Sequence, residues 1–106
     1  MSALVLYTTF SDTETASRIA QVLVEEGLAA CCNILPQITS IYQWEGEVQK
    51  ESEVLVLIKT TRYRYRALQD RLIELHPYDV PEVLALPVQY GSRAYLDWIE
   101  DVVGRA

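Results

Sequence analysis

The chain has 106 residues, half of them hydrophobic, which is enough for one core and predicts a single domain over residues 1–106. Nine basic and fifteen acidic side chains give a formal net charge of −6, so the average surface repels nucleic-acid phosphates and anionic lipid. Neither nucleic acid nor a membrane is therefore an expected partner. The N-terminus has no basic region before its apolar stretch, and no apolar run approaches the roughly 18 residues of a membrane span, which predicts a cytoplasmic location.

A β-prone run at residues 3–10 is the first predicted element, and a helix follows it. Ser11 and Glu14 have the spacing of a capping box, which predicts that Ser11 caps this helix. Apolar residues recur at helical spacing as far as Leu23. Gly27 then stands where a left-handed residue would end the helix.

Residues 28–44 and 47–61 are predicted to form two strands of a long hairpin that turns around Gly46. Each arm has about 14 residues, which at roughly 3.3 Å per residue reaches some 45 Å. The first helix, at about 15 residues, spans only about 22 Å. The distal half of the hairpin should therefore extend beyond the core. Pro36 cannot donate to the ladder and predicts a bend or bulge where this extension begins.

A second predicted helix follows Thr60 and Thr61, a plausible cap, and must end before Pro77. Residues 82–91 then predict a fourth strand. Ser92 opens a short last helix, whose apolar stripe is expected to consist of Tyr95, Leu96, Ile99 and Val102.

This order of elements predicts an α+β, ferredoxin-like βαββαβ fold with an extra C-terminal helix. In the third strand, Val54 and Val56 lie on one face and Leu55 and Leu57 on the other, so both faces of the sheet should be buried. Too few helices remain to cover the second face, which indicates contact with another chain. A free two-stranded ribbon is marginal in water, so the distal hairpin should also contact a neighbouring subunit. The residues expected in that interface are Ile38, Ile41, Tyr42 and Trp44.

The stretches "GLAACCNILPQITSIYQWEGEVQKESEVLVLIKT", "HPYDVPEVLALPV" and "YLDWI" together resemble the CutA divalent-cation tolerance family, and the resemblance runs nearly the whole chain. It implies a cytoplasmic homotrimer of ferredoxin-like subunits with interlocking hairpins. It also implies a role in the tolerance of, or response to, divalent metal ions such as copper. No obligatory cofactor is expected, and copper or another divalent metal is the candidate ligand.

The copper site that the resemblance implies uses a cysteine in the first strand and two consecutive histidines after the second helix. Tyr7, Leu75 and His76 stand at these positions, so one of three ligands is present. Asp79 and Glu82 lie nearby in sequence, and one imidazole with carboxylates is a weak site that does not select copper. Three interpretations of His76 stay open: a weak metal ligand, a structural residue favoured by the helix dipole, or part of a small-molecule site.

A PII-like signalling module is the alternative function, because such proteins resemble this trimeric plan and bind nucleotides or other small anions between subunits. Lys59 at the end of an apolar strand and Asn33 inside another could bind an anion. Tyr78 and Glu82 complete the candidate ligand cleft. An enzyme is not expected, because the sequence shows no Ser/His/Asp, Cys/His or paired-carboxylate arrangement.

Overall fold

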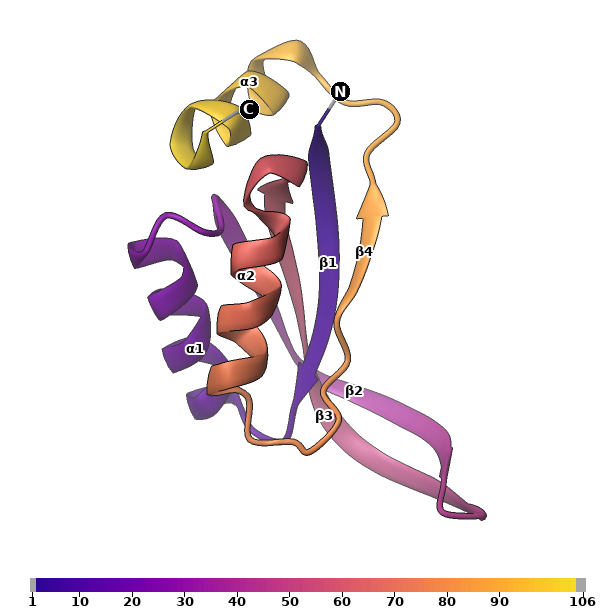
Figure 1. Cartoon of the computed structure of the whole chain (residues 1–106). Helices are drawn as coiled ribbons and strands as arrows, with labels where there is room; N and C mark the ends of the chain where they lie inside the picture. The colour runs from indigo at the N-terminus through magenta and orange to yellow at the C-terminus, as the bar shows by residue number, and fades with distance from the viewer. Residues whose placement is uncertain (1, 105–106) are drawn as a thin grey trace.

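The computed structural model describes residues 2–104, which form one antiparallel four-stranded sheet and three helices. The strands lie in the order β2-β3-β1-β4. Helices α1 and α2 lie side by side on one face of the sheet, and α3 lies at the end where β1 begins (Figure 1). The elements are β1 (Ala3–Phe10), α1 (Thr13–Glu25), β2 (Cys31–Trp44), β3 (Glu47–Thr61), α2 (Arg62–Leu75), β4 (Leu84–Pro87) and α3 (Arg93–Val103).

The start of α1 differs by one residue from the prediction. Asp12, and not Ser11, is the N-cap: its carboxylate accepts a hydrogen bond from the Thr15 backbone N–H at 2.7 Å. An ionised carboxylate also suits the positive end of the helix dipole, which favours Asp12 over its neighbour. The prediction for Gly27 is confirmed, because its φ of 74° is left-handed.

The long hairpin is confirmed, and β2 and β3 pair from Cys31 to the turn. Glu45 and Gly46 have φ angles of 51° and 84°, which is the pattern of a tight two-residue hairpin turn. The register shifts between Leu35 and Ile38, as the proline between them predicts. Beyond this bulge, the hairpin leaves the body of the molecule (Figure 1).

Three predictions for the second half of the chain are wrong: the side-chain cap of α2, the length of β4 and the apolar stripe of α3. The hydroxyl of Thr61 at the N-cap of α2 makes no cap bond and donates instead to the Gly104 carbonyl at 3.1 Å. Strand β4 is shorter than predicted and covers Leu84–Pro87, and one further backbone bond joins the Val88 N–H to the Ala3 carbonyl at 3.0 Å. In α3, Ser92 is the N-cap as predicted. Its buried stripe is Leu96, Ile99 and Val103, whereas Tyr95 and Val102 are exposed.

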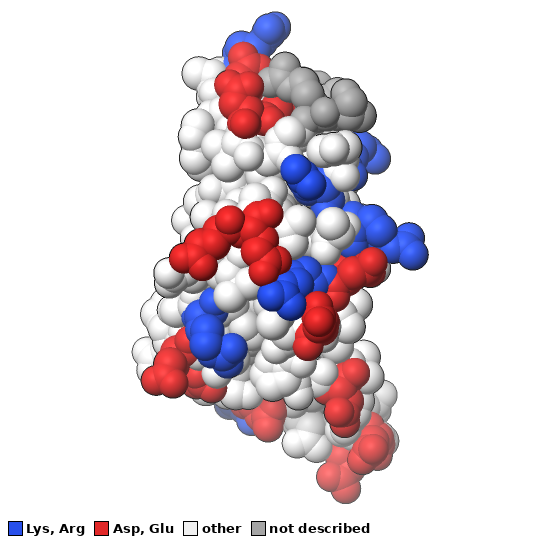
Figure 2. Space-filling model, turned by 60° about the vertical axis from the view of Figure 1, so that its left-hand side comes forward, with Lys and Arg blue, Asp and Glu red and all other residues white. Residues whose placement is uncertain are grey.

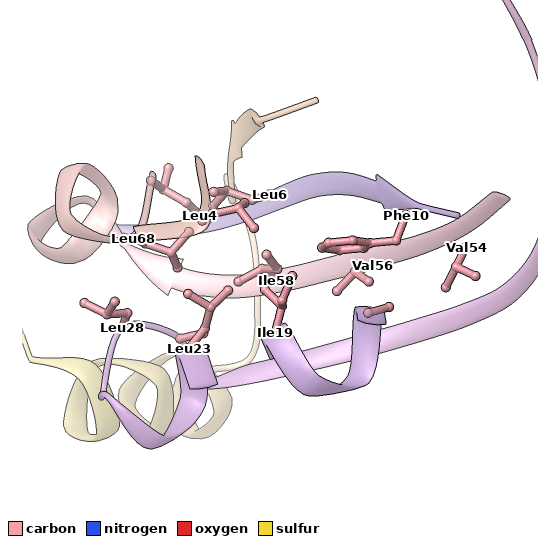
Figure 3. Packing of buried hydrophobic residues seen from close by; sticks show 13 residues of the cluster. Leu4, Leu6, Phe10, Ile19, Leu23, Leu28, Val54, Val56, Ile58 and Leu68 are labelled. Carbon is pink, nitrogen blue, oxygen red and sulfur yellow. The ribbon is translucent and has the colours of Figure 1, made fainter. Parts of the chain in front are cut away.

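The core lies between the sheet and helices α1 and α2. Figure 3 shows Ile19 and Leu23 of α1 next to Ile58 of β3, and all three side chains are almost completely buried. Burial of each such side chain stabilises the fold by about 1.5–3 kcal/mol relative to leaving it in water. The other large members are Leu4, Leu6, Phe10, Leu28, Val54, Val56, Leu68 and Leu72.

The opposite face of the sheet is apolar as well, as predicted. Strand alternation and register place Val5, Leu55 and Leu57 there, together with Leu84 and Leu86 of β4. Leu84 and Leu86 are 59% and 53% exposed. Helix α3 packs only at one end of this face, against Ala3 and Ala30. We call the remainder the open sheet face.

Charged side chains of both signs lie next to each other over the surface shown in Figure 2. Arg71 pairs with Glu26 at 2.9 Å and with Glu74 at 3.0 Å, and Arg66 pairs with Asp70 at 3.7 Å. Of the arginines at the start of α2, Arg66 thus has an acidic partner, and Arg64 Nε donates to the Val103 carbonyl at 2.6 Å. In the part of the chain from residue 2 to 104, no helix has the length and hydrophobicity needed to cross a membrane.

Candidate functional site: an acidic groove at the base of the hairpin

A groove of about 690 Å³ lies between the distal hairpin and the loop at residues 76–82. Its lining combines aromatic rings, apolar side chains and four carboxylates. Strand β3 supplies Glu51 and Glu53, and the loop supplies Asp79 and Glu82. The other lining residues are Thr9, Ser11, Ser40, Ile41, Tyr42, Trp44, Tyr78 and Val80.

His76 lies behind this groove and is only 7% exposed. Its Nδ1 accepts a hydrogen bond from the Tyr78 backbone N–H at 3.1 Å, so Nδ1 carries no proton. Nε2 therefore carries the proton and donates to the Thr9 carbonyl at 2.8 Å. The ring also stacks on Phe10, with centroids 4.3 Å apart and planes 13° apart.

Burial lowers the pKa of His76 below its ordinary value, although the Thr9 carbonyl and the nearby Glu53 carboxylate act in the opposite direction. The ring is thus neutral at neutral pH. His76 caps α2 only through its backbone N–H, which donates to the Leu72 carbonyl at 2.9 Å. Its side chain instead contacts the end of β1. The helix dipole therefore does not explain this histidine, and its contacts with the end of β1 do.

The residues at the implied copper positions do not fit that metal. Both ring nitrogens of His76 already have partners, and a ligand nitrogen needs a free lone pair. Tyr7 lies on the open sheet face opposite Leu57, whereas Leu75 packs against the core. Across residues 2–104, no group of three or more His, Cys, Asp and Glu side chains could hold a metal ion.

Two tyrosines bind the carboxylates of β3. The Tyr42 hydroxyl donates to Glu51, and this bond raises the pKa of Tyr42 to about 12. The Tyr78 hydroxyl donates to Glu53 at 2.8 Å and lies 3.1 Å from the Ser11 hydroxyl. Sequence reasoning missed the roles of Glu51, Glu53 and Ser11. No local pattern brings together β3, the residue before α1 and the loop at residues 76–82.

The four candidate ligand residues divide between two places. Tyr78 lies in the groove wall together with Glu82. Asn33 and Lys59 lie on the open sheet face, where Lys59 pairs in register with Cys31. Lys59 Nζ lies 5.6 Å from the centroid of the Tyr95 ring in α3. Within one chain these four residues therefore do not share a cleft, and a cleft between subunits stays a prediction.

The cysteines offer little soft-ligand chemistry. Both are free, and Cys31 Sγ lies 3.9 Å from Asn33 Oδ1. Cys32 faces the core side, where burial raises the pKa of its thiol to about 12. Such a thiol is not a thiolate ligand at neutral pH.

The predicted interface residues lie on the distal hairpin, away from the core. Ile41 is 66% exposed and Trp44 is 48% exposed, and both contribute to the groove. Tyr42 is exposed and Ile38 is half-buried. Their contact with another subunit stays a prediction.

Comparison with known proteins gives one consistent family. Residues 4–102 match the model of the CutA1 divalent ion tolerance protein. The divalent-cation tolerance protein CutA of Thermus thermophilus is 51% identical over 104 residues, which are 98% of this chain and all of that protein. Human protein CutA is 47% identical over 96 residues, which are 91% of this chain and 54% of the human protein.

The fold agrees with this result. The solved structure of divalent cation tolerance protein Cut A1 from Thermus thermophilus has a TM-score of 0.93 and 49% identity, and the match covers 96% of this chain and 99% of that one. This level of identity over a whole domain shows the family as well as the fold. The chain belongs to the CutA1 divalent ion tolerance family.

Proposed function

We propose that the chain acts in divalent-cation tolerance as a non-enzymatic homotrimer of ferredoxin-like subunits. The observation that carries this proposal is the open sheet face, on which Leu84 and Leu86 are more than half exposed in the single chain. An apolar surface of this kind, together with the exposed Ile41 and Trp44 of the distal hairpin, indicates a protein interface. The family membership supplies the link to divalent cations.

We infer that any metal binding is weak and exchangeable, because no group of three or more His, Cys, Asp and Glu side chains in residues 2–104 could hold a resident metal ion. The groove offers carboxylate oxygens from Glu51, Glu53, Asp79 and Glu82. Oxygen donors suit hard divalent cations, whereas copper prefers imidazole and thiolate. With His76 engaged by the backbone at both nitrogens, copper would compete with the folded structure for this ring.

The same contacts support a non-enzymatic role. The only histidine has no free nitrogen with which to move a proton. Ser11, one of two serines among the described groove residues, contacts the Tyr78 hydroxyl instead. A serine or cysteine nucleophile needs an adjacent base, which this arrangement does not provide.

The PII-like alternative has less support. An anion site would need basic groups in addition to Lys59, and among residues 2–104 the groove lining contains four carboxylates and no lysine or arginine. Lys59 itself contacts the Tyr95 ring of the same chain. The cytoplasmic location stays a prediction from the sequence.

The proposal can be tested in cells that lack their own CutA-like protein. Growth is measured across a series of copper, zinc and cobalt concentrations with the parent chain, an assembly-deficient variant or an empty vector. We expect the parent alone to raise the tolerated concentration of at least one cation. Equal growth of all three strains, with the parent shown to be assembled, would contradict the proposed role.

A further inference from the structure

The distal hairpin, residues 36–53, makes few side-chain hydrogen bonds to the rest of the described chain. Beyond the bulge at Leu35 and Ile38, strands β2 and β3 pair with each other only. Of the side-chain hydrogen bonds within residues 2–104, one joins the segment 36–53 to the rest of the chain: that from the Tyr78 hydroxyl to Glu53 at 2.8 Å. The orientation of the hairpin thus depends strongly on this bond.

Tyr78 is itself held by contacts with two parts of the body. Its backbone N–H donates to His76 Nδ1, and His76 in turn donates to the Thr9 carbonyl at the end of β1. The two rings are tilted, with centroids 4.7 Å apart. The Tyr78 hydroxyl also lies 3.1 Å from Ser11 Oγ, just before α1. These contacts hold the Tyr78 hydroxyl in position independently of its bond to Glu53.

We propose that Tyr78 is a positioning residue that fixes the direction of the distal hairpin and so pre-orients it for the neighbouring subunit. This inference rests on the proposed self-association. A two-stranded ribbon without support samples many directions, and ordering it on assembly lowers affinity. A hydrogen bond to a carboxylate from a half-buried, pre-positioned hydroxyl is strong enough to restrict this motion.

The arrangement also explains the role of His76 in the family motif of this chain. The histidine does not reach the hairpin, and it acts by holding the loop that carries Tyr78. Thr9, Phe10, His76 and Tyr78 then form one continuous connection from β1 to Glu53 of β3. We call this connection the Tyr78 link.

The test uses Tyr78→Phe, which removes only the hydroxyl, with Tyr90→Phe as the matched control, because Tyr90 is 86% exposed. Both are made in a Trp98→Phe background, which leaves Trp44 near the hairpin turn as the single tryptophan. Time-resolved fluorescence anisotropy of Trp44 then reports hairpin motion. Sedimentation equilibrium reports the subunit concentration at half assembly.

We expect Tyr78→Phe to raise the half-assembly concentration about tenfold and to lower the residual anisotropy of Trp44, with thermal unfolding close to that of the control. Unchanged anisotropy in folded Tyr78→Phe would overturn the inference. If the parent stays monomeric, the proposed function fails, but the anisotropy of the monomers still tests the link. Should Tyr78→Phe not fold, Glu53→Ala removes the same bond from the hairpin side, and its Trp44 anisotropy decides in the same way.

Discussion

His76 joins the end of β1 to the loop that carries Tyr78. The sequence shows a lone histidine at the end of a helix and leaves metal binding, dipole stabilisation and ligand binding open. The structure gives each ring nitrogen a backbone partner, from Thr9 and from Tyr78. These partners are 67 and two positions away, and no local pattern identifies a contact over 67 residues.

Copper titration is the first prediction at this scale. We expect only weak Cu(II) binding by the parent in isothermal titration calorimetry, with little change in His76→Ala, because the ring nitrogens are engaged within the fold. Leu75→His should bind Cu(II) more tightly by adding a second imidazole beside His76. Submicromolar binding by the parent that disappears in His76→Ala would show that His76 is a metal ligand after all.

The second prediction concerns pH and stability. Burial lowers the pKa of folded His76 below 6.5, the ordinary value that the unfolded chain retains. As the pH falls through about 6.5, the unfolded state binds a proton before the folded state does, so the free energy of unfolding decreases. Above that pH both states are neutral and the contribution is constant. Urea unfolding between pH 7.5 and 5.5 should show this decrease in the parent and a flatter profile in His76→Gln; equal slopes would exclude a depressed pKa.

At the scale of elements, the sequence predicts the order of strands and helices correctly because its patterns are local. Apolar periodicity, Gly27 after α1 and Gly46 in the hairpin turn act within a few residues of their own positions. The groove cannot be read in this way. It forms only because the fold brings the hairpin base and the loop at residues 76–82 together.

Gly46 provides a prediction for the hairpin turn. Its φ of 84° is costly for residues with a Cβ, and the position has open space around it, so the cost of substitution is conformational and not steric. Gly46→Ala should destabilise the turn by about 1 kcal/mol, whereas Gly46→Asn should cost less because Asn tolerates this region. Amide hydrogen exchange of Trp44 and Glu47, the hydrogen-bonded pair that flanks the two-residue turn, should be about fivefold faster in the alanine variant. Equal exchange rates in Gly46→Ala and Gly46→Asn would contradict a conformational origin of the cost.

Trp44 tests the interface assigned to the distal hairpin. The ring is 48% exposed and belongs to no core cluster of the subunit, so the fold should tolerate its removal. If the ring packs against a neighbour, Trp44→Ala should raise the half-assembly concentration at least tenfold, since buried aromatic residues dominate interface energies. Circular dichroism should remain that of the parent. A variant that unfolds while subunit affinity is unchanged would place Trp44 inside its own subunit.

For the whole molecule, the open sheet face connects sequence, fold and proposed assembly. Consecutive apolar residues in β1 and β3 predict a sheet that is apolar on both faces, and the structure confirms this. Helices α1 and α2 cover one face (Figure 1). Helix α3 packs against Ala3 and Ala30 at one end of the other face. The number of subunits cannot follow from these local patterns, because it depends on the angle at which two such faces meet.

Leu86→Lys tests whether the open sheet face is the surface that brings subunits together. Leu86 is 53% exposed on this face, and a lysine there would be desolvated without a partner in any assembly that covers it. Ile73→Lys is the matched control, since Ile73 is 48% exposed but lies on α2, which packs on the opposite side of the sheet. In sedimentation equilibrium at micromolar concentration, the parent and Ile73→Lys should be trimers and Leu86→Lys a folded monomer. Because both substitutions add one positive charge to an exposed apolar position, a general effect of charge would act on both. Trimers in all three samples would mean that the open sheet face lies outside the subunit contact, and a folded monomeric parent would remove the basis for assembly altogether.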